Sequence, residues 1–357
     1  EMVWKEENAT GRGVTVAVID SGILPTPSLI RALAKNPKEE LNGKDDDGNG
    51  LIDDVFGYDF TSNTGYVLET GRTMSHGSSC AGIIAGRSSA KGWQTAISPD
   101  CRLLLLKGGF DLRSMEYLLA NGADVVSMSY MIVGRDLGQI RGLFRNAFEH
   151  MSLGGVLAVG GAGNYGPKSR RAMPAGKQIG LPKDIPSVLA VAGVDQKRVP
   201  LPFSSQGPCF WEGVKFFSDY PKDKPLGKPD LTAFPTGYPV WNVTTPLNAR
   251  RGWKEVSKDK GASLIVGPAG NSFSGPHCAG VAALVFSANP AINPWEVSEI
   301  LQETGKDLGA KGRDNAYGAG LIDALAAADA ADDSGGLSLL PQTDDESVDP
   351  TVDDAAG

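Results

Sequence analysis

The sequence predicts an α/β fold of three layers, with a mostly parallel central sheet and helices on both faces. Short apolar runs rich in Val, Ile, Leu and Ala recur along the first 200 residues, and segments with helical periodicity lie between them. Such alternation is typical of a parallel sheet whose strands are joined by helices. The 357 residues are also enough for one large domain with an ample core.

The expected strands are short and contain few polar residues. They cover residues 14–19, 103–106, 125–129, 156–159 and 188–191. Helices are expected from near Ser75 and over residues 113–120, 138–151, 272–288, 295–303 and 321–331. Catalytic groups in such sheets usually lie at the carboxyl ends of strands. Asp20 directly follows the first expected strand and therefore has that position.

The chain is expected to form one domain over residues 1–331, followed by an acidic tail over 332–357. Within the domain, residues 209–262 are rich in Pro, Trp, Lys and Gly, which predicts loops or an insertion. Eight of the 42 acidic residues lie in 331–357, which leaves 34 acidic and 34 basic residues elsewhere. The acidity thus belongs to a disordered tail or linker, and nucleic acid is not an expected partner.

Four cysteines are too few and too scattered for a disulfide framework or a zinc site. Buried free thiols are the favoured interpretation, although a bridge between any two of them stays open. No run approaches 18 apolar residues, so no membrane span is expected.

Three polar residues stand where nucleophilic catalysis would need them. Asp20 ends a strand, His76 opens a helix of small residues, and Ser272 opens an apolar helix. A serine hydroxyl needs an imidazole to take its proton, and the imidazole needs a carboxylate to hold its tautomer. The free N–H groups at the start of a helix would also favour an oxyanion beside Ser272.

Each of these residues also has an ordinary structural explanation. Asp20 could be a turn residue, His76 a structural histidine and Ser272 an N-cap. Their order along the chain and their sequence contexts together favour a catalytic triad.

The three contexts resemble conserved blocks of the subtilisin-like serine proteases, the subtilase family. Residues 16–23 (VAVIDSGI) resemble the family's Asp block, 76–82 (HGSSCAG) its His block, and 270–280 (GNSFSGPHCAG) its Ser block. The similarity extends from about Thr10 to Ala328. It implies a subtilisin-like fold for the three-layer catalytic domain.

The resemblance also implies an activity. The expected protein is a serine endopeptidase that hydrolyses polypeptides through an acyl-enzyme, with Asp20, His76 and Ser272 as its triad. Two alternatives stay open: a peptide ligase or macrocyclase with the same acyl-enzyme, and a non-catalytic binding protein on the same fold.

Further site residues follow from the same resemblance. Gly161, Ala162, Gly163 and Asn164 resemble the family's AAGN block, which implies that Asn164 donates its amide to the oxyanion. A dinucleotide-binding turn is the weaker alternative, because the glycines do not fit that fingerprint.

Two segments are expected to edge the substrate cleft. Ser129, Tyr130 and Met131 align with the extended segment that pairs with substrate backbone, and residues 161–164 would form the other wall of the primary pocket. Tyr130 and Met131 are bulkier than usual there, which predicts a reshaped pocket. The basic Lys168, Arg170 and Arg171 follow, and an acidic preference or a solvated loop would each account for them.

Three residues near the triad depart from the family pattern. Ser79 stands where a second histidine is common, and Asn271 where threonine is usual. Cys80 lies one turn after His76, where proteinase K-like members also have a thiol.

The run from Asp45 to Asp54 predicts a calcium site. It places oxygen ligands as in an EF-hand-like loop, although the twelfth position is Phe56 instead of Glu. Many subtilases carry a similar DDDGNG insertion and bind calcium, and a solvated acidic turn is the alternative. The expected ligands of this structural calcium are Asp45, Asp47, Asn49, the carbonyl of Leu51, and Asp53.

Location and assembly follow from the resemblance alone. It implies an extracellular or cell-envelope protein with a cleaved pro-segment, and we expect a monomer. Two sequons, at Asn8 and Asn242, are compatible with secretion, whereas unpaired cysteines favour the opposite.

Overall fold

The computed structural model describes residues 2–69, 75–87, 95–109, 111–243, 245, 249–259 and 262–333. The predicted acidic tail lies outside these residues from 334 onward, so its disorder stays a prediction. Among the described residues, no helix combines the length and the apolar character that crossing a membrane requires.

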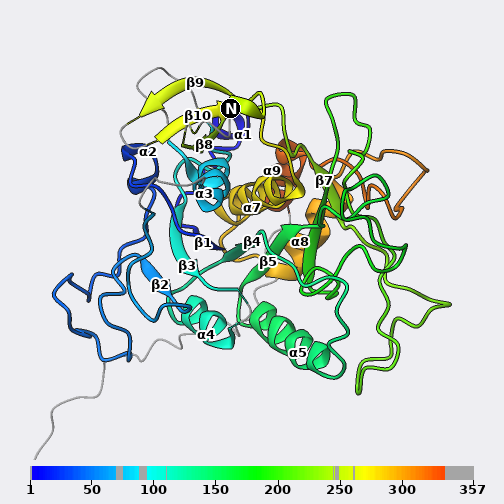
Figure 1. Ribbon diagram of the computed structural model, residues 1–357, viewed down its shortest axis with the longest axis horizontal. Helices are drawn as coiled ribbons and strands as arrows, with labels where there is room; N and C mark the ends of the chain where they lie inside the picture. Colours follow the sequence, from blue (N-terminus) through cyan, green and yellow to red (C-terminus); the bar gives the residue numbers. More distant parts are fainter. Residues whose placement is uncertain are drawn as a thin grey trace, which may run out of the picture.

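A seven-stranded sheet forms the centre of the domain (Figure 1). All its neighbouring strands run parallel, in the order β2-β3-β1-β4-β5-β6-β7. The strands are β1 (Thr15–Asp20), β2 (Gly57–Asp59), β3 (Arg102–Lys107), β4 (Val125–Met128), β5 (Leu157–Gly161), β6 (Val188–Gly193) and β7 (Leu231–Ala233). The chain order reverses between β1 and β4, so the carboxyl ends of these strands lie at a topological switch point.

Helices cover both faces of this sheet, as predicted (Figure 1). Alternate side chains of β1 enter different cores: Val16 and Val18 pack in the cluster with α3 and α7, and Ala17 and Ile19 in the cluster with α4 and α5. The helices are α1 (Met2–Glu6), α2 (Pro27–Ile30), α3 (His76–Ala85), α4 (Leu112–Ala120), α5 (Ile140–Leu153), α7 (Asn271–Ala288), α8 (Pro294–Glu303) and α9 (Ala324–Asp333). Burial on both faces explains why the strands are almost continuously apolar.

The five predicted strands are confirmed as β1, β3, β4, β5 and β6, and the predicted helices are present with ends shifted by a few residues. The expectation of loops over 209–262 was wrong at residues 231–233, 240–242 and 254–259, which form strands. Leu231–Ala233 is the seventh strand of the central sheet, and Trp241 lies fully buried on β8 (Val240–Asn242). Three-residue strands are too short to show periodicity, so composition alone suggested loops.

A second, antiparallel sheet of three strands lies near α3, in the order β8-β10-β9. Its other strands are β9 (Lys254–Asp259) and β10 (Ala262–Val266). The Trp241 ring on β8 packs so closely on α3 that a side chain at Gly82 would collide with it. This small sheet therefore supports the helix that carries His76.

Candidate active site

Asp20 and His76 meet at the carboxyl edge of the central sheet. Asp20 is the last residue of β1, and His76 is the first residue of α3, whose N-cap is Ser75. The His76 Nδ1 atom lies 2.9 Å from both carboxylate oxygens of Asp20. A side chain at Gly77 would collide with the backbone of Gly22, so only glycine lets α3 approach β1 this closely.

Ser21 joins the same two elements. Its backbone N–H donates to Asp20 Oδ1 at 2.8 Å, and its Oγ accepts the backbone N–H of Gly77 at 3.0 Å. These bonds orient the carboxylate and satisfy one of the free N–H groups at the start of α3.

The pair shifts the pKa of both groups. Burial raises the pKa of Asp20, but His76 and the Ser21 N–H outweigh this effect, so the net pKa is lowered. A thiolate at Cys80 would raise the pKa of His76, and the Asp20 carboxylate raises it above 6.5, against burial. Burial also raises the pKa of the Cys80 thiol, which is therefore neutral near neutral pH. The Asp20 carboxylate is then the charge that stabilises the imidazolium.

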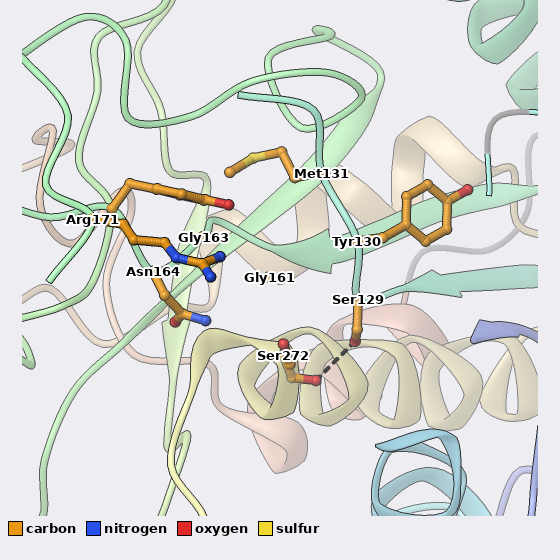
Figure 2. Close-up of a pocket in the computed structure, with 9 residues that line it drawn as sticks. Ser129, Tyr130, Met131, Gly161, Gly163, Asn164, Arg171 and Ser272 are labelled. Atoms are coloured by element: carbon orange, nitrogen blue, oxygen red, sulfur yellow. Dashed lines mark hydrogen bonds between the residues drawn. The ribbon is translucent and has the colours of Figure 1, made fainter. Parts of the chain in front are cut away.

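Ser272 lies at the start of α7, but it is not the N-cap. Gly270 has that position, so the N-cap explanation of Ser272 was wrong. Pro276 lies inside the helix and has no N–H to donate to the carbonyl of Ser272. That carbonyl instead accepts a hydrogen bond from Ser129 Oγ at 2.8 Å (Figure 2). It also accepts one from the Cys80 thiol at 3.4 Å.

Ser272 and His76 share neighbouring residues. The Cys80 thiol that touches the Ser272 carbonyl also lies 3.7 Å from His76 Nδ1. The next residue after the serine, Phe273, stacks on the His76 ring with centroids 5.9 Å apart. Among the described residues, none forms a hydrogen bond with the Ser272 hydroxyl, which is partly exposed. Its proton is thus available for transfer when substrate aligns the two groups.

Asn164 is held so that its amide donor stays available. Its Oδ1 accepts the backbone N–H of Asn271 at 2.9 Å, which leaves the NH₂ group without a partner among the described residues. The Asn271 side chain donates in turn to the carbonyl of Gly163 at 2.8 Å and to Ser204 Oγ at 2.9 Å. Asn271, which stands where the family usually has threonine, thus links residues 161–163 to the start of α7.

The other two residues that depart from the family pattern, Ser79 and Cys80, also have hydrogen-bond partners. Ser79 Oγ donates to the backbone carbonyl of Trp241 at 2.8 Å, which links α3 to β8. All four cysteines are buried free thiols, as favoured from the sequence: Cys80, Cys101, Cys209 and Cys278.

A pocket of about 150 Å³ lies between the two predicted walls of the cleft (Figure 2). Its lining is Ser129, Tyr130, Met131, Gly161, Gly163, Asn164, Tyr165, Arg171 and Ser272. Ala162, also predicted to line the cleft, is fully buried and donates its N–H to Val191 instead. The structure therefore brings together five of the six predicted substrate-binding residues.

A second hollow of about 510 Å³ lies beside Asp20 and His76. Asp20, His76, Gly109 and Tyr130 contribute to its lining. The Tyr130 hydroxyl donates to the carbonyl of Gly109 at 2.6 Å, which fixes the ring on this side of the cleft. Tyr130 thus shapes the second hollow with its ring, and Met131 shapes the first.

The predicted calcium loop uses its carboxylates in two ways. Asp45 and Asp53 accept backbone N–H groups of the loop itself, from Gly48, Asn49 and Gly50 and from Asn42 and Gly43 respectively. Asp47 accepts the N–H of Asn49 at 3.1 Å and also lies near Glu39 and Asp54, with one carboxylate oxygen of each residue within 4.8 Å of the others.

Glu39 and Asp54 are buried and incompletely paired. Glu39 is 1% exposed and Asp54 0% exposed, and Glu39 Oε2 and Asp54 Oδ1 have no hydrogen-bond partner. Buried carboxylate oxygens without partners are costly unless a cation neutralises them. Hard oxygens in a tight group suit Ca²⁺, so this trio fits the metal that the sequence predicted. Glu39 and Asp54 were not among the ligands expected from the sequence.

The comparisons with known proteins agree with this geometry. The model of the subtilase family matches residues 11–320. The chain is similar to serine protease AprX of Bacillus subtilis, at 28% identity over 91% of this chain and 68% of AprX. It is also similar to subtilisin DY of Bacillus licheniformis, at 25% identity over 89% of this chain and 92% of subtilisin DY. A solved lanthipeptide protease shares the fold, with a TM-score of 0.63 at 20% identity over 92% of this chain and 91% of that one. The chain therefore belongs to the subtilase family, a family of serine-type endopeptidases.

Proposed function

We propose that this chain cleaves polypeptides through an acyl-enzyme formed on Ser272, with His76 as general base and Asp20 as its orienting carboxylate. The observation that carries the proposal is the contact of His76 Nδ1 with both oxygens of Asp20 at 2.9 Å. That contact leaves Nε2 as the ring nitrogen that can exchange a proton with the serine.

The steps follow from these roles. Ser272 Oγ attacks the scissile carbonyl carbon while His76 Nε2 takes the hydroxyl proton. His76 then returns the proton to the leaving amine as the C–N bond breaks, and a water molecule attacks the acyl-enzyme with His76 again as base. The free amide of Asn164 and the backbone N–H of Ser272 stabilise the oxyanion in both halves of the reaction.

Incubation with linear peptides, followed by mass spectrometry of the products, tests the proposal. Hydrolysis gives two fragments whose masses sum to that of the peptide plus one water. A ligase or macrocyclase gives joined or cyclic products without added water, and a binding protein leaves the peptide intact. Ser272→Ala should abolish product formation, whereas Ser287→Ala, on the exposed far end of α7, should not.

We further propose that Glu39, Asp47 and Asp54 hold a structural calcium ion. The unpaired buried oxygens of Glu39 and Asp54 support this ligand set over a merely solvated acidic turn. Asp45, Asn49 and Asp53 then shape the loop through their hydrogen bonds to its backbone.

The remaining expectations are proposals of the same kind. Secretion is supported by a similarity to the minor extracellular protease Epr of Bacillus subtilis, at 26% identity over 90% of this chain and 39% of Epr. A cleaved pro-segment and a monomeric state follow from the family resemblance alone.

A further inference from the structure

We propose that the pocket beside Ser272 selects an acidic side chain, Asp or Glu, on the acyl side of the cleaved bond, and that Arg171 is the residue that selects it. This inference rests on the proposed peptidase function and names the class of substrate that it takes.

The lining of this pocket carries one charge. Of its nine lining residues, Arg171 alone has an ionisable group that is charged at neutral pH. Figure 2 shows its guanidinium pointing toward the space between the 129–131 and 161–164 segments. No described residue forms an ion pair or a side-chain hydrogen bond with this guanidinium, so its donors are available to a substrate.

The backbone around Arg171 is fixed to the catalytic segment. The backbone N–H of Met173 donates to the carbonyl of Tyr165 at 3.0 Å, which closes the loop between them. Ser169 Oγ accepts the N–H of Arg171 at 3.1 Å and donates to the carbonyl of Asn164 at 2.6 Å. The backbone of Arg171 is thus linked through Ser169 to the backbone of the proposed oxyanion donor, which helps to fix the position of a specificity residue.

Anchors at the other side of the loop hold it in place. The N–H groups of Gly166 and Lys168 donate to the carbonyls of Phe203 and Pro202, at 2.9 and 3.1 Å. Lys168 and Arg170 are exposed, as Arg171 itself is, but they do not line the pocket. Of the three basic residues that the sequence placed after Asn164, only Arg171 therefore faces the substrate.

Met131 limits the depth of the pocket. Its side chain reaches across to Gly163, where any side chain would collide with its methyl group, and it packs on the apolar cluster with Ala162 and Ile179. Its sulfur also accepts the backbone N–H of Gly180 at 3.1 Å. Met131 thus narrows the pocket of about 150 Å³ that it lines, which disfavours a large aromatic group.

Charge and depth together point to one class of side chain. A short carboxylate fits a shallow pocket and pairs with a guanidinium in two parallel hydrogen bonds. A lysine or arginine at the same position would face Arg171 and be repelled. An uncharged glutamine has the shape of glutamate but lacks the charge, which makes the two a matched pair of substrates.

The experiment compares kcat/KM for peptides that differ only at this position, carrying Glu, Gln, Ala, Phe or Lys. We expect the Glu peptide to be cleaved roughly 10- to 100-fold more efficiently than the Gln peptide, the range for one charge-assisted pair. Arg171→Gln should bring the ratio close to one, because kcat/KM for the Glu peptide falls to the level of the Gln peptide. Arg171→Glu should reverse the preference in favour of Lys.

Arg170→Gln and Lys168→Gln are matched controls on the same loop and should keep the preference for Glu. Mass spectrometry of the fragments confirms the cleaved bond in each peptide. Equal cleavage of the Glu and Gln peptides, or a preference that survives in Arg171→Gln, would overturn the inference while leaving the peptidase function intact. Failure to cleave any of the peptides would overturn both, and covalent labelling of Ser272 then shows whether the catalytic machinery itself is absent.

Discussion

The groups around His76 determine the pH range in which its imidazole can act as a base. Asp20 contacts its Nδ1, and the carboxylate favours the charged form of the ring. A base works only when it is deprotonated, so a raised pKa moves the acidic limit of activity to higher pH.

We therefore expect kcat/KM to fall on acidification with an apparent pKa above the ordinary 6.5 of histidine. Asp20→Asn should move this limit to lower pH and greatly reduce kcat, because the imidazolium loses its stabilising charge. Cys80→Ala should leave the limit unchanged, since the thiol is neutral there. The measurement is a pH profile of kcat/KM for the three proteins, and an acidic limit at or below 6.5 in the wild type would contradict the assignment.

One hydrogen bond of the Asn164 side chain supports its proposed role as an oxyanion donor. Its Oδ1 is occupied by the N–H of Asn271, so its NH₂ group is the one that can reach an oxyanion. Asn164→Ala should lower kcat by about 10²–10³-fold, the range found when one oxyanion donor is removed from a subtilisin, with KM little changed. Steady-state kinetics check this. If the same loss of kcat/KM came from a raised KM with kcat unchanged, Asn164 would be assigned to substrate binding instead.

At the scale of elements, the segment 129–131 rests on a buried lysine. Lys183 is fully buried, and its Nζ donates to the backbone carbonyl of Tyr130. Burial lowers the pKa of Lys183 from 10.5 to about 7. The ammonium also lies 4.9 Å from the centre of the Tyr130 ring.

This buried amine predicts a pH dependence of stability. Between about pH 7 and 10.5 the unfolded chain binds a proton at Lys183 that the folded chain does not. The free energy of unfolding therefore rises with pH across this window. Below the window Lys183 is charged in both states, and its buried charge destabilises the folded chain to the full extent. Lys183→Met should flatten the rise of Tm between pH 7 and 10. An unchanged slope in thermal unfolding would show that Lys183 is not the titrating group.

Helix α7 and the loop after β5 show which features of the site local sequence motifs can predict and which they cannot. Local motifs placed Asp20, His76 and Ser272 correctly at the ends of β1, α3 and α7, because each motif depends on a few adjacent residues. The pairing of Asn164 with Asn271 spans 107 residues and was not evident from the sequence.

For the whole molecule, the layer order could be predicted, but the short strands and the long-range clusters could not. Runs of apolar residues reveal central strands, whereas a three-residue edge strand such as β7 leaves almost no pattern. Glu39 precedes the acidic run and approaches Asp54 only through the fold. Arg171 likewise faces the pocket because its loop closes on Tyr165.

The proposed calcium site predicts a stability effect on the whole domain. Binding at 100 times Kd stabilises the folded state by about 2.7 kcal/mol, so added Ca²⁺ should raise Tm by roughly 5 °C over protein in EDTA. Glu39→Gln and Asp54→Asn should abolish this rise, and Asp136→Asn, on an exposed loop, should not. Differential scanning calorimetry measures it, and a Tm insensitive to Ca²⁺ in the wild type would exclude the site.

The proposed chemistry depends on Ser272 being an activated nucleophile. Reaction with a fluorophosphonate, followed by peptide mapping in a mass spectrometer, measures this reactivity. We predict one covalent adduct, located on Ser272, absent from Ser272→Ala and strongly slowed in His76→Ala. An unlabelled wild-type protein that is fully folded, or an adduct that persists in Ser272→Ala, would show that Ser272 is not the nucleophile.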